Sequence, residues 1–238
     1  MKLDILAFGA HPDDVELGCG ATIAKETSLG KSVGIIDLTR GELGTRGTAE
    51  TRDLEAENAS TILKVAIREN LGFRDGFFKN NEKNQLEIIK ILRKYQPEIV
   101  LCNAINDRHI DHGKGSKLVS DACFLSGLLK IETSVNGNIQ QPWRPKLVYH
   151  YIQWATIEPD FVVDVSNFME VKMEAIKAYK TQFYDPNSNE PESPITSKNF
   201  LDSVQYRAQD LGRLIGSNYA EGFTVERYLA VNSLHDLK

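Results

Sequence analysis

"KLDILAFGAHPDDVELGCGATIAKETSLGKSVGIIDLT", residues 2–39, is the stretch that decides the fold class of this chain. Apolar residues dominate 2–10 and 33–39, and both runs have the length of buried strands. Between them, residues 14–29 carry apolar side chains at helical spacing, and Gly30 ends the pattern. A strand, a helix and a second buried strand in this order are typical of a parallel sheet with helical connections.

The same alternation continues along the chain. Further helices are expected at 49–65, 84–96 and 112–129, further strands at 66–73, 98–104 and 146–153, and a strand followed by a helix at 161–183. The side chains expected to face the core from the helix at 49–65 are Leu54, Ala59, Ile62 and Leu63. Residues 184–200 predict a surface loop, and a last helix ends near Gly216. We therefore expect one α/β domain over residues 1–238, a Rossmann-like three-layer sandwich with a mostly parallel sheet.

Composition narrows the class of protein. The net charge of the 238 residues is −5 and no basic run is present, so we expect no nucleic-acid partner. The longest apolar stretches are far shorter than the roughly 20 residues that a membrane span needs. Asp4 and His11 interrupt the N-terminal apolar run, which is therefore not typical of a signal peptide. Cys19, Cys102 and Cys123 have no paired spacing, so we expect reduced thiols and a cytoplasmic protein.

Polar loops follow three of the predicted strands, at 11–14, 40–48 and 103–112. The carboxyl ends of parallel strands share one edge of the sheet, where ligands bind in open α/β folds, so we expect these loops to converge. The first and third loops supply these imidazoles and carboxylates: His11, Asp13, Asp14, His109, Asp111 and His112. Catalytic zinc takes three such ligands and keeps one open position, and hydrolysis also needs an acid and a base. The pattern therefore predicts a hydrolytic metal site.

Simpler interpretations exist for each motif alone. Asp13 or Asp14 would serve as a helix cap after Pro12, and a lone pair of loop histidines is usually solvated. Gly18 and Gly20, with Asp37 as a ribose-binding acid, would suit dinucleotide binding, but the glycine motif is incomplete, and close helix packing or a longer loop before the helix explains the glycines better. A non-catalytic Rossmann-like sugar- or nucleotide-binding protein, in which the histidines and aspartates are structural, is the alternative from another class. Cys102 has no base beside it in the sequence and is interpreted as a buried core thiol. The pairing of two histidine clusters at strand ends favours the metal site.

Five stretches carry a resemblance to a known family: "AHPDDVELGCGATIA" (10–24), "LTRGELGTRGT" (38–48), "TRDLEAENA" (51–59), "DRHIDHGKGSKLV" (107–119) and "YAEGF" (219–223). In this order, over nearly the whole chain, they resemble the LmbE-like, or PIG-L, family of zinc-dependent N-acetylglucosamine deacetylases. The resemblance implies the LmbE-like fold, one zinc ion per chain and a homo-oligomer, in many members a hexamer. Other divalent metals also accept these ligands. Ile110, where many relatives carry proline, and Arg108 are mild departures that remove no ligand.

The resemblance also implies roles for individual residues. His11, Asp14 and His112 match the metal ligands. Asp13 matches the general base that takes a proton from the attacking water. His109 matches the group that stabilises the oxyanion or protonates the leaving amine, and Asp111 matches a carboxylate that holds a histidine in one tautomer.

The substrate implied by the resemblance is a small amino-sugar conjugate. The stretch from Leu38 to Ala56 is most similar to the branch that deacetylates N-acetylglucosaminyl malate in bacillithiol biosynthesis, and another N-acetyl sugar such as a chitooligosaccharide is the alternative. The expected substrate contacts are Arg52 and Arg108 for carboxylates, with Arg46 nearby and Glu42 for sugar hydroxyls. Arg52 would instead pair with Glu55 if it only stabilised its own helix. The residues whose roles the sequence leaves open are Tyr179, Lys180, Gln182 and Glu221.

Overall fold

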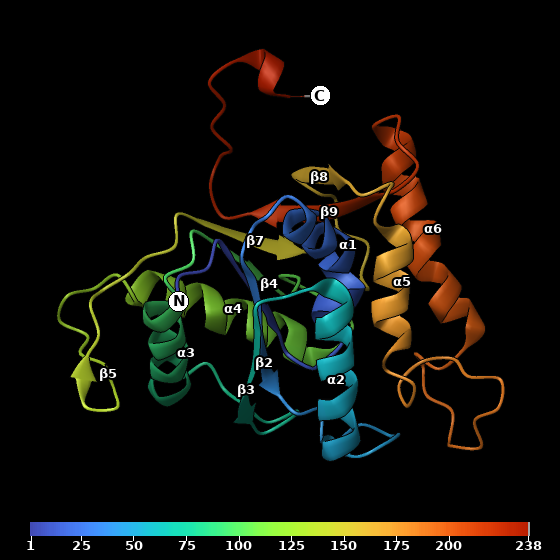
Figure 1. Cartoon of the computed structure of the whole chain (residues 1–238), viewed down its shortest axis with the longest axis horizontal. Helices are drawn as coiled ribbons and strands as arrows, with labels where there is room; N and C mark the ends of the chain where they lie inside the picture. Colours follow the sequence, from blue (N-terminus) through green and yellow to red (C-terminus); the bar gives the residue numbers. More distant parts are fainter. Residues whose placement is uncertain (238) are drawn as a thin grey trace.

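Seven strands form one mixed sheet in the computed structural model, which describes residues 1–237 (Figure 1). The strands of this sheet are β1 (Ile5–Gly9), β2 (Val33–Thr39), β3 (Ile67–Phe73), β4 (Ile99–Cys102), β7 (Leu147–Tyr151), β8 (Phe161–Asp164) and β9 (Ala220–Val225). A separate small hairpin consists of β5 (Ser134–Val135) and β6 (Asn138–Ile139). The helices are α1 (Asp14–Ser28), α2 (Ala49–Leu63), α3 (Glu82–Tyr95), α4 (Ile110–Leu125), α5 (Met169–Lys177), α6 (Lys198–Leu214) and the 3-10 turn η1 (Leu234–Asp236).

The strand order is β3-β2-β1-β4-β7-β9-β8. The first five strands are parallel to one another, whereas β9 runs antiparallel to both of its neighbours, β7 and β8. Every residue of β1 and β2 is buried, because helices cover both faces of the sheet at its centre. The predicted α/β class with a mostly parallel sheet is confirmed.

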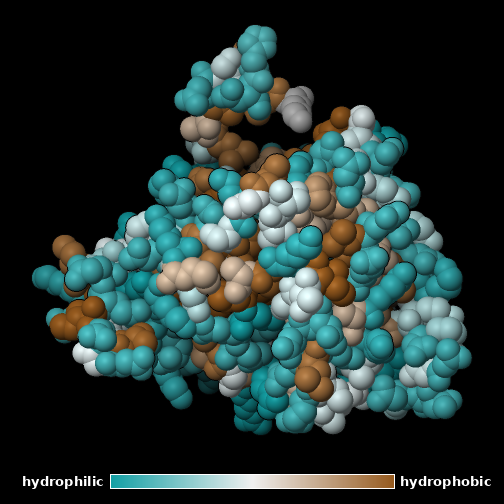
Figure 2. Space-filling model, in the orientation of Figure 1, coloured by the Kyte–Doolittle hydropathy of each residue, from teal (hydrophilic) through white to brown (hydrophobic). Residues whose placement is uncertain are grey.

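The helices form two layers, one on each face of the sheet (Figure 1). Helices α1, α2, α5 and α6 pack over one hydrophobic core, which includes Ile23, Ile35 and Ile176. Helices α3 and α4 pack over the second core on the opposite face, which includes Phe8, Ile88 and Leu118. The outer surface in this view is mostly hydrophilic (Figure 2), and no helix within residues 1–237 is long and apolar enough to cross a membrane.

Three local features differ from the sequence expectations. Leu54 is 62% exposed, so its expected place in the core is wrong; the buried positions of α2 are Arg52, Glu55, Ala56, Ala59 and Leu63, and Leu54 lies between them on the outer side. Strand β9 and the hairpin were not expected. Helix α1 is kinked at Cys19 (φ −143°, ψ 21°), and the N–H groups of Ala21 and Thr22 donate to Glu221 at 3.1 and 2.7 Å.

The parallel strands place five loops at one edge of the sheet. Loops after β1, β2 and β4 were expected there, and loops after β3 and β7 join them. Together with α6, these loops line a cavity with a volume of about 440 Å³. The topology therefore brings the two histidine motifs into one cavity although they are almost a hundred residues apart in sequence.

Candidate active site

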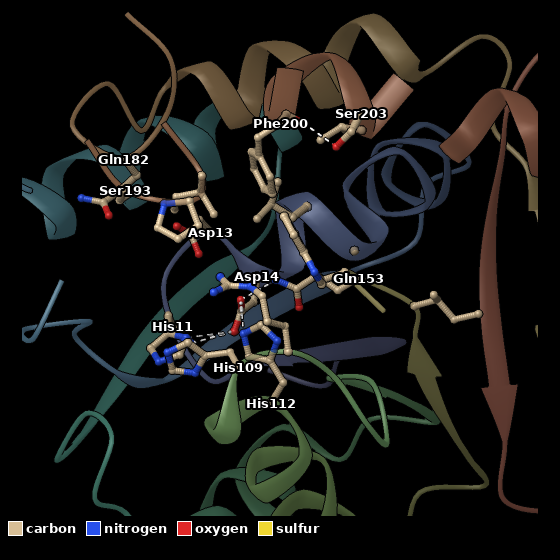
Figure 3. A pocket seen from close by; sticks show the side chains of 18 of the residues that line it. His11, Asp13, Asp14, His109, His112, Gln153, Gln182, Ser193, Phe200 and Ser203 are labelled. Carbon is tan, nitrogen blue, oxygen red and sulfur yellow. Dashed lines mark hydrogen bonds and ion pairs between the residues drawn. The ribbon is translucent and has the colours of Figure 1, made fainter. Parts of the chain in front are cut away.

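Three histidines meet at the bottom of the cavity, where Figure 3 shows them beside Asp14. His11 follows β1, and His109 and His112 lie at the start of α4. One ring nitrogen from each lies within 4.8 Å of the other two. Phe200 and Ser203 of α6 lie across the cavity from them (Figure 3). The predicted convergence of the two motifs is therefore observed.

Asp14 lies between two of these histidines. Its carboxylate is 3.5 Å from His11 Nδ1 and 3.1 Å from His112 Nε2. The opposite ring nitrogens contact other carboxylates: His11 Nε2 is 3.0 Å from Asp75, and His112 Nδ1 is 2.7 Å from Asp107. Each imidazole thus presents one nitrogen to Asp14 and has the other held from behind, as metal-ligating histidines usually do.

The carboxylates around His11 and His112 stabilise positive charge between these two histidines and Asp14. Burial lowers the pKa of His112, but the Asp14 carboxylate and the hydrogen bond with Asp107 outweigh burial and raise this pKa to about 9. Burial raises the pKa of Asp14, yet the charge of His112 and hydrogen bonds with His11 and His112 hold it well below the usual value. Buried imidazole and carboxylate donors that attract a cation are the donor set that zinc and similar divalent metals prefer, so these residues fit a metal ion.

A second group of possible metal donors shares His11. It consists of His11, Asp75 and Asp111, with donor atoms within 4.8 Å of one another. The carboxylate oxygens of Asp111 also accept hydrogen bonds from Gly76 N at 2.7 Å and Lys114 Nζ at 3.0 Å. Because these partners already use its oxygens, Asp111 is suited to hold His11, whose Nε2 is 3.6 Å away, rather than to bind metal itself.

Asp13 has an unusual backbone. Its φ of 114° lies in a region that side chains other than glycine rarely adopt, and a conformation of this kind costs of order 1–3 kcal/mol. Asp13 occupies the N-cap position of α1 but makes no side-chain capping bond, so the capping interpretation does not hold for it. Instead its carboxylate lines the cavity, 3.3 Å from Arg52 Nη2. Burial raises the pKa of Asp13 to about 7, against the opposing charge of Arg52.

Glycine at position 13 should relieve this strain. We expect the free energy of unfolding of Asp13→Gly to be about 1 kcal/mol higher than that of Asp13→Ala, so that the glycine variant is the more stable one. This holds even though glycine loses more backbone entropy on folding. Both variants lack the carboxylate, so their difference isolates the backbone. Urea denaturation of the two proteins measures it, and an alanine variant as stable as the glycine variant would show that position 13 is unstrained.

His109 and Asp111 are close together at the start of α4. The backbone N–H of Asp111 donates to His109 Nδ1 at 3.3 Å, so a neutral His109 carries its proton on Nε2. Burial, together with the charges of His11 and His112, lowers the pKa of His109 and favours this neutral form. His109 lines the cavity and is therefore a candidate hydrogen-bond donor to a substrate oxygen.

Sequence reasoning missed four polar side chains that contact, and so orient, the two histidines and Asp14. Asp75 and Asp107 contact the far nitrogens of the two histidines. Asn103 Nδ2 and Gln153 Nε2 donate to the Asp14 carboxylate at 3.0 and 2.7 Å. Asp107 and Asn103 lie inside the polar loop after β4 that was already singled out, so a search for a carboxylate near His112 would have found Asp107. Asp75 and Gln153 follow β3 and β7 without any local signal.

Removing the carboxylate behind His112 should weaken metal binding. We expect Asp107→Asn to lower zinc affinity by about 10–100-fold, the usual effect of such a partner. Competition with a chromogenic chelator measures the affinity. Asp53→Asn makes the same chemical change at an exposed position outside the lining of this cavity, and as the matched control it should leave affinity unchanged. Equal affinities in the two variants would show that Asp107 does not orient a metal ligand.

The predicted substrate contacts lie in different surroundings. Arg52 is buried and donates to Gly41 O at 3.3 Å and to Gln182, while Glu55 accepts from Thr181, so the alternative Arg52–Glu55 pair does not form. Arg46 lines the cavity but donates to the backbone of Pro191 and Glu190 at 2.6 and 3.2 Å.

Of the remaining residues considered as substrate contacts, some line the cavity and others lie outside it. Arg108 lines the cavity, with its guanidinium 4.9 Å from the Trp154 ring centre. Glu42 is exposed and accepts a hydrogen bond from Asp75 N at 2.8 Å. Of the residues whose roles were left open, Gln182 and Glu221 line the cavity; Tyr179 is buried against Glu16, and Lys180 is exposed.

Two alternative interpretations of the sequence can also be judged. Asp37 is not free for a ribose, because both of its oxygens accept hydrogen bonds from Arg68, at 2.7 and 2.9 Å. Cys102 is buried as expected, but His150 Nδ1 lies 3.2 Å from its sulfur, a base that is remote in sequence. All three cysteines are free and buried.

The buried histidine–carboxylate cluster fits a metal-dependent hydrolase, and comparison with known proteins identifies the family. Residues 6–123 match the family described as GlcNAc-PI de-N-acetylase, PIG-L. The diacetylchitobiose deacetylase of Thermococcus kodakarensis is 31% identical over 189 residues, which are 75% of this chain and 70% of that protein. The chain therefore belongs to the PIG-L family of deacetylases.

Solved structures support the same fold. The conserved protein TT1542 from Thermus thermophilus is 35% identical, with a TM-score of 0.86 over 97% of this chain and 98% of that one. The N,N'-diacetylchitobiose deacetylase from Pyrococcus horikoshii is 24% identical, with a TM-score of 0.78 over 98% of this chain and 88% of that one. The second likeness is one of fold alone.

Proposed function

We propose that this protein hydrolyses the acetamido group of a small N-acetyl amino sugar. The observation that carries the proposal is the meeting of His11, His112 and two adjacent aspartates, Asp13 and Asp14, in one cavity. The family match and the deacetylase from Thermococcus kodakarensis support an amide of an amino sugar as the reacting group.

We assign His11, Asp14 and His112 as the ligands of one zinc ion per chain. When bound, zinc polarises the acetyl carbonyl and lowers the pKa of water, which supplies the nucleophile at neutral pH. Asp75 and Asp107 fix the orientation of the two imidazoles, and Asn103 and Gln153 fix that of Asp14.

In the proposed reaction Asp13 moves a proton and His109 donates a hydrogen bond. Asp13 accepts the proton of the attacking water, and its pKa of about 7 is suited to a base at neutral pH. Arg52 holds the Asp13 carboxylate at 3.3 Å. His109 donates through Nε2 to the oxygen that becomes negative, a contribution often worth about 3–4 kcal/mol. As the C–N bond breaks, the proton held by Asp13 passes to the leaving nitrogen, so that acetate and the free amine leave and Asp13 is again a carboxylate.

Two substrate types have support. Diacetylchitobiose-like sugars are supported by the relative from Thermococcus kodakarensis, which favours another N-acetyl sugar over the malate conjugate. N-acetylglucosaminyl malate remains a second candidate because Arg108 and Arg207 line the cavity and neither forms an ion pair with a carboxylate in residues 1–237. Guanidinium groups that are not paired with a carboxylate suit the two carboxylates of malate.

Acetate release across a small panel tests the proposal. N-acetylglucosamine, diacetylchitobiose and N-acetylglucosaminyl malate are each incubated with zinc-loaded protein, and acetate is measured by an enzymatic assay. We expect release from at least one member, with the highest kcat/KM marking the substrate type. Release from none of the three would contradict the proposed N-acetyl sugar substrate.

A further inference from the structure

Helix α1 consists of two segments that meet at Cys19. The backbone of Cys19 (φ −143°, ψ 21°) is not helical, so the first turn, 14–18, is separate from the second segment, 20–28. The first turn carries Asp14 and directly follows Asp13, and both aspartates line the cavity, whereas no residue of the second segment does. The kink therefore sets the direction in which the two aspartates are presented to the cavity.

The second segment begins without a cap from its own sequence. Cys19 is at its N-cap position, where serine, threonine, aspartate or asparagine usually accepts a hydrogen bond from the second or third N–H group. Those groups belong to Ala21 and Thr22, and both donate to Glu221, at 3.1 Å to Oε1 and 2.7 Å to Oε2. A carboxylate from strand β9 thus takes the place of the local cap and puts negative charge at the positive end of the segment.

Lys172 of α5 pairs with the same carboxylate. Its Nζ lies 2.6 Å from Glu221 Oε1, and both side chains are 3% exposed. A buried ion pair is often no more stable than apolar side chains of similar volume, so stability alone does not account for this pair. The charges compensate each other, which allows a carboxylate to lie at the kink in the interior of the domain.

The first turn of α1 is closely packed at both of its ends. A Cβ at Gly18 would lie 2.1 Å from the ring of Tyr151, and a Cβ at Gly9 would lie 3.2 Å from Asp14 Cβ. Close-packed interiors transmit strain, so a shift at the kink would displace the Asp14 carboxylate instead of being absorbed within the turn.

We propose that Glu221 is a positioning residue for the reaction: by capping the second segment of α1, it fixes the direction of the turn that presents Asp13 and Asp14. This inference rests on the proposed function, in which the two aspartates are the base and a metal ligand. Glu221 is not available to a substrate, because its oxygens already accept hydrogen bonds from two N–H groups and Lys172. It acts through the backbone of α1.

Glu221→Gln in protein loaded with cobalt(II) instead of zinc tests the inference. The amide keeps the size of the side chain but has one oxygen for two N–H donors. The visible bands of cobalt(II) depend on the arrangement of its ligands, so we expect their positions or intensities to change. In zinc-loaded protein, kcat should fall by about 10–100-fold, since a displacement of about 1 Å can cost a factor of 100, and KM should change much less. A cobalt spectrum identical to that of the unaltered protein would overturn the inference.

Variants of α5 separate the cap from the ion pair. Lys172→Met keeps the Glu221 carboxylate and its two N–H bonds, so the cobalt spectrum should stay that of the unaltered protein. Glu174→Gln repeats the glutamate-to-glutamine exchange on the exposed side of α5 and should have no effect. If Lys172→Met altered the spectrum as much as Glu221→Gln, the ion pair and not the cap would hold the turn, and the inference would be wrong.

A double variant covers the case in which Glu221→Gln alone does not fold. Combining it with Lys172→Met removes the ammonium that the amide would leave unpaired in the interior, and the altered cobalt spectrum should persist. The spectrum is read without turnover, so a failure of this inference is distinct from a failure of the proposed function, which would appear as no acetate release from any N-acetyl sugar.

Discussion

Asp13→Asn is expected to slow deacetylation strongly while the metal stays bound, whereas Asp14→Asn is expected to lose both the metal and the activity. The two variants make the same chemical change at adjacent positions. Asp14 lies between His11 and His112, while Asp13 points to Arg52. Loss of a general base typically lowers the rate by about 10²–10⁴-fold, and we expect a fall of this size in kcat for Asp13→Asn.

Asparagine is chosen because it disturbs the structure least. It tolerates the positive φ at position 13 better than most residues, and at position 14 it keeps one oxygen for His11 N or Asn103 Nδ2. Elemental analysis after dialysis gives metal per chain, and acetate release gives kcat. Loss of zinc from Asp13→Asn with retention in Asp14→Asn would reverse the two assignments.

Arg52→Gln is expected to lower kcat/KM by about 100-fold on neutral and acidic substrates alike. The reason is that Arg52 contacts the base rather than the solvent: it binds Asp13, Gly41 O and Gln182. A catalytic group displaced by about 1 Å commonly costs a factor of this order. The structure thus suggests a positioning role for a residue that the sequence marked as a carboxylate clamp.

Arg108→Gln provides the matched comparison. Arg108 is exposed over Trp154, so its loss should weaken only substrates that carry a carboxylate. Both variants are assayed with N-acetylglucosamine and N-acetylglucosaminyl malate. Arg52→Lys should recover part of the activity, because an ammonium can pair with Asp13. If Arg52→Gln reduced turnover of the malate conjugate alone, Arg52 would be a substrate clamp after all.

The fold was largely predictable because its centre follows a simple pattern. Residues 2–39 alternate between a buried run, an amphipathic stretch and a second buried run, and these became β1, α1 and β2. Strand β9 was not predictable in this way. Glu221 is buried within it because Lys172 compensates its charge and two backbone N–H groups donate hydrogen bonds to it, and no local sequence pattern reveals these distant partners.

The site was predictable only where its residues cluster in sequence. His11, Asp14, His109 and His112 come from two motifs, and parallel topology accounts for their meeting. Asp75 is a single acid in a loop, and only the three-dimensional position of β3 brings it to His11. The strained backbone of Asp13 has no sequence signal either, since aspartate is common at the ends of helices in ordinary conformations.

Acetate release before and after chelation tests the central claim most directly. Protein that releases acetate from diacetylchitobiose or N-acetylglucosamine is treated with a chelator, dialysed and titrated with zinc. We expect activity to disappear and to return in proportion to zinc, with full recovery near one equivalent per chain. Undiminished acetate release from protein holding less than about a tenth of an equivalent of metal would contradict a metal-dependent site at His11, Asp14 and His112.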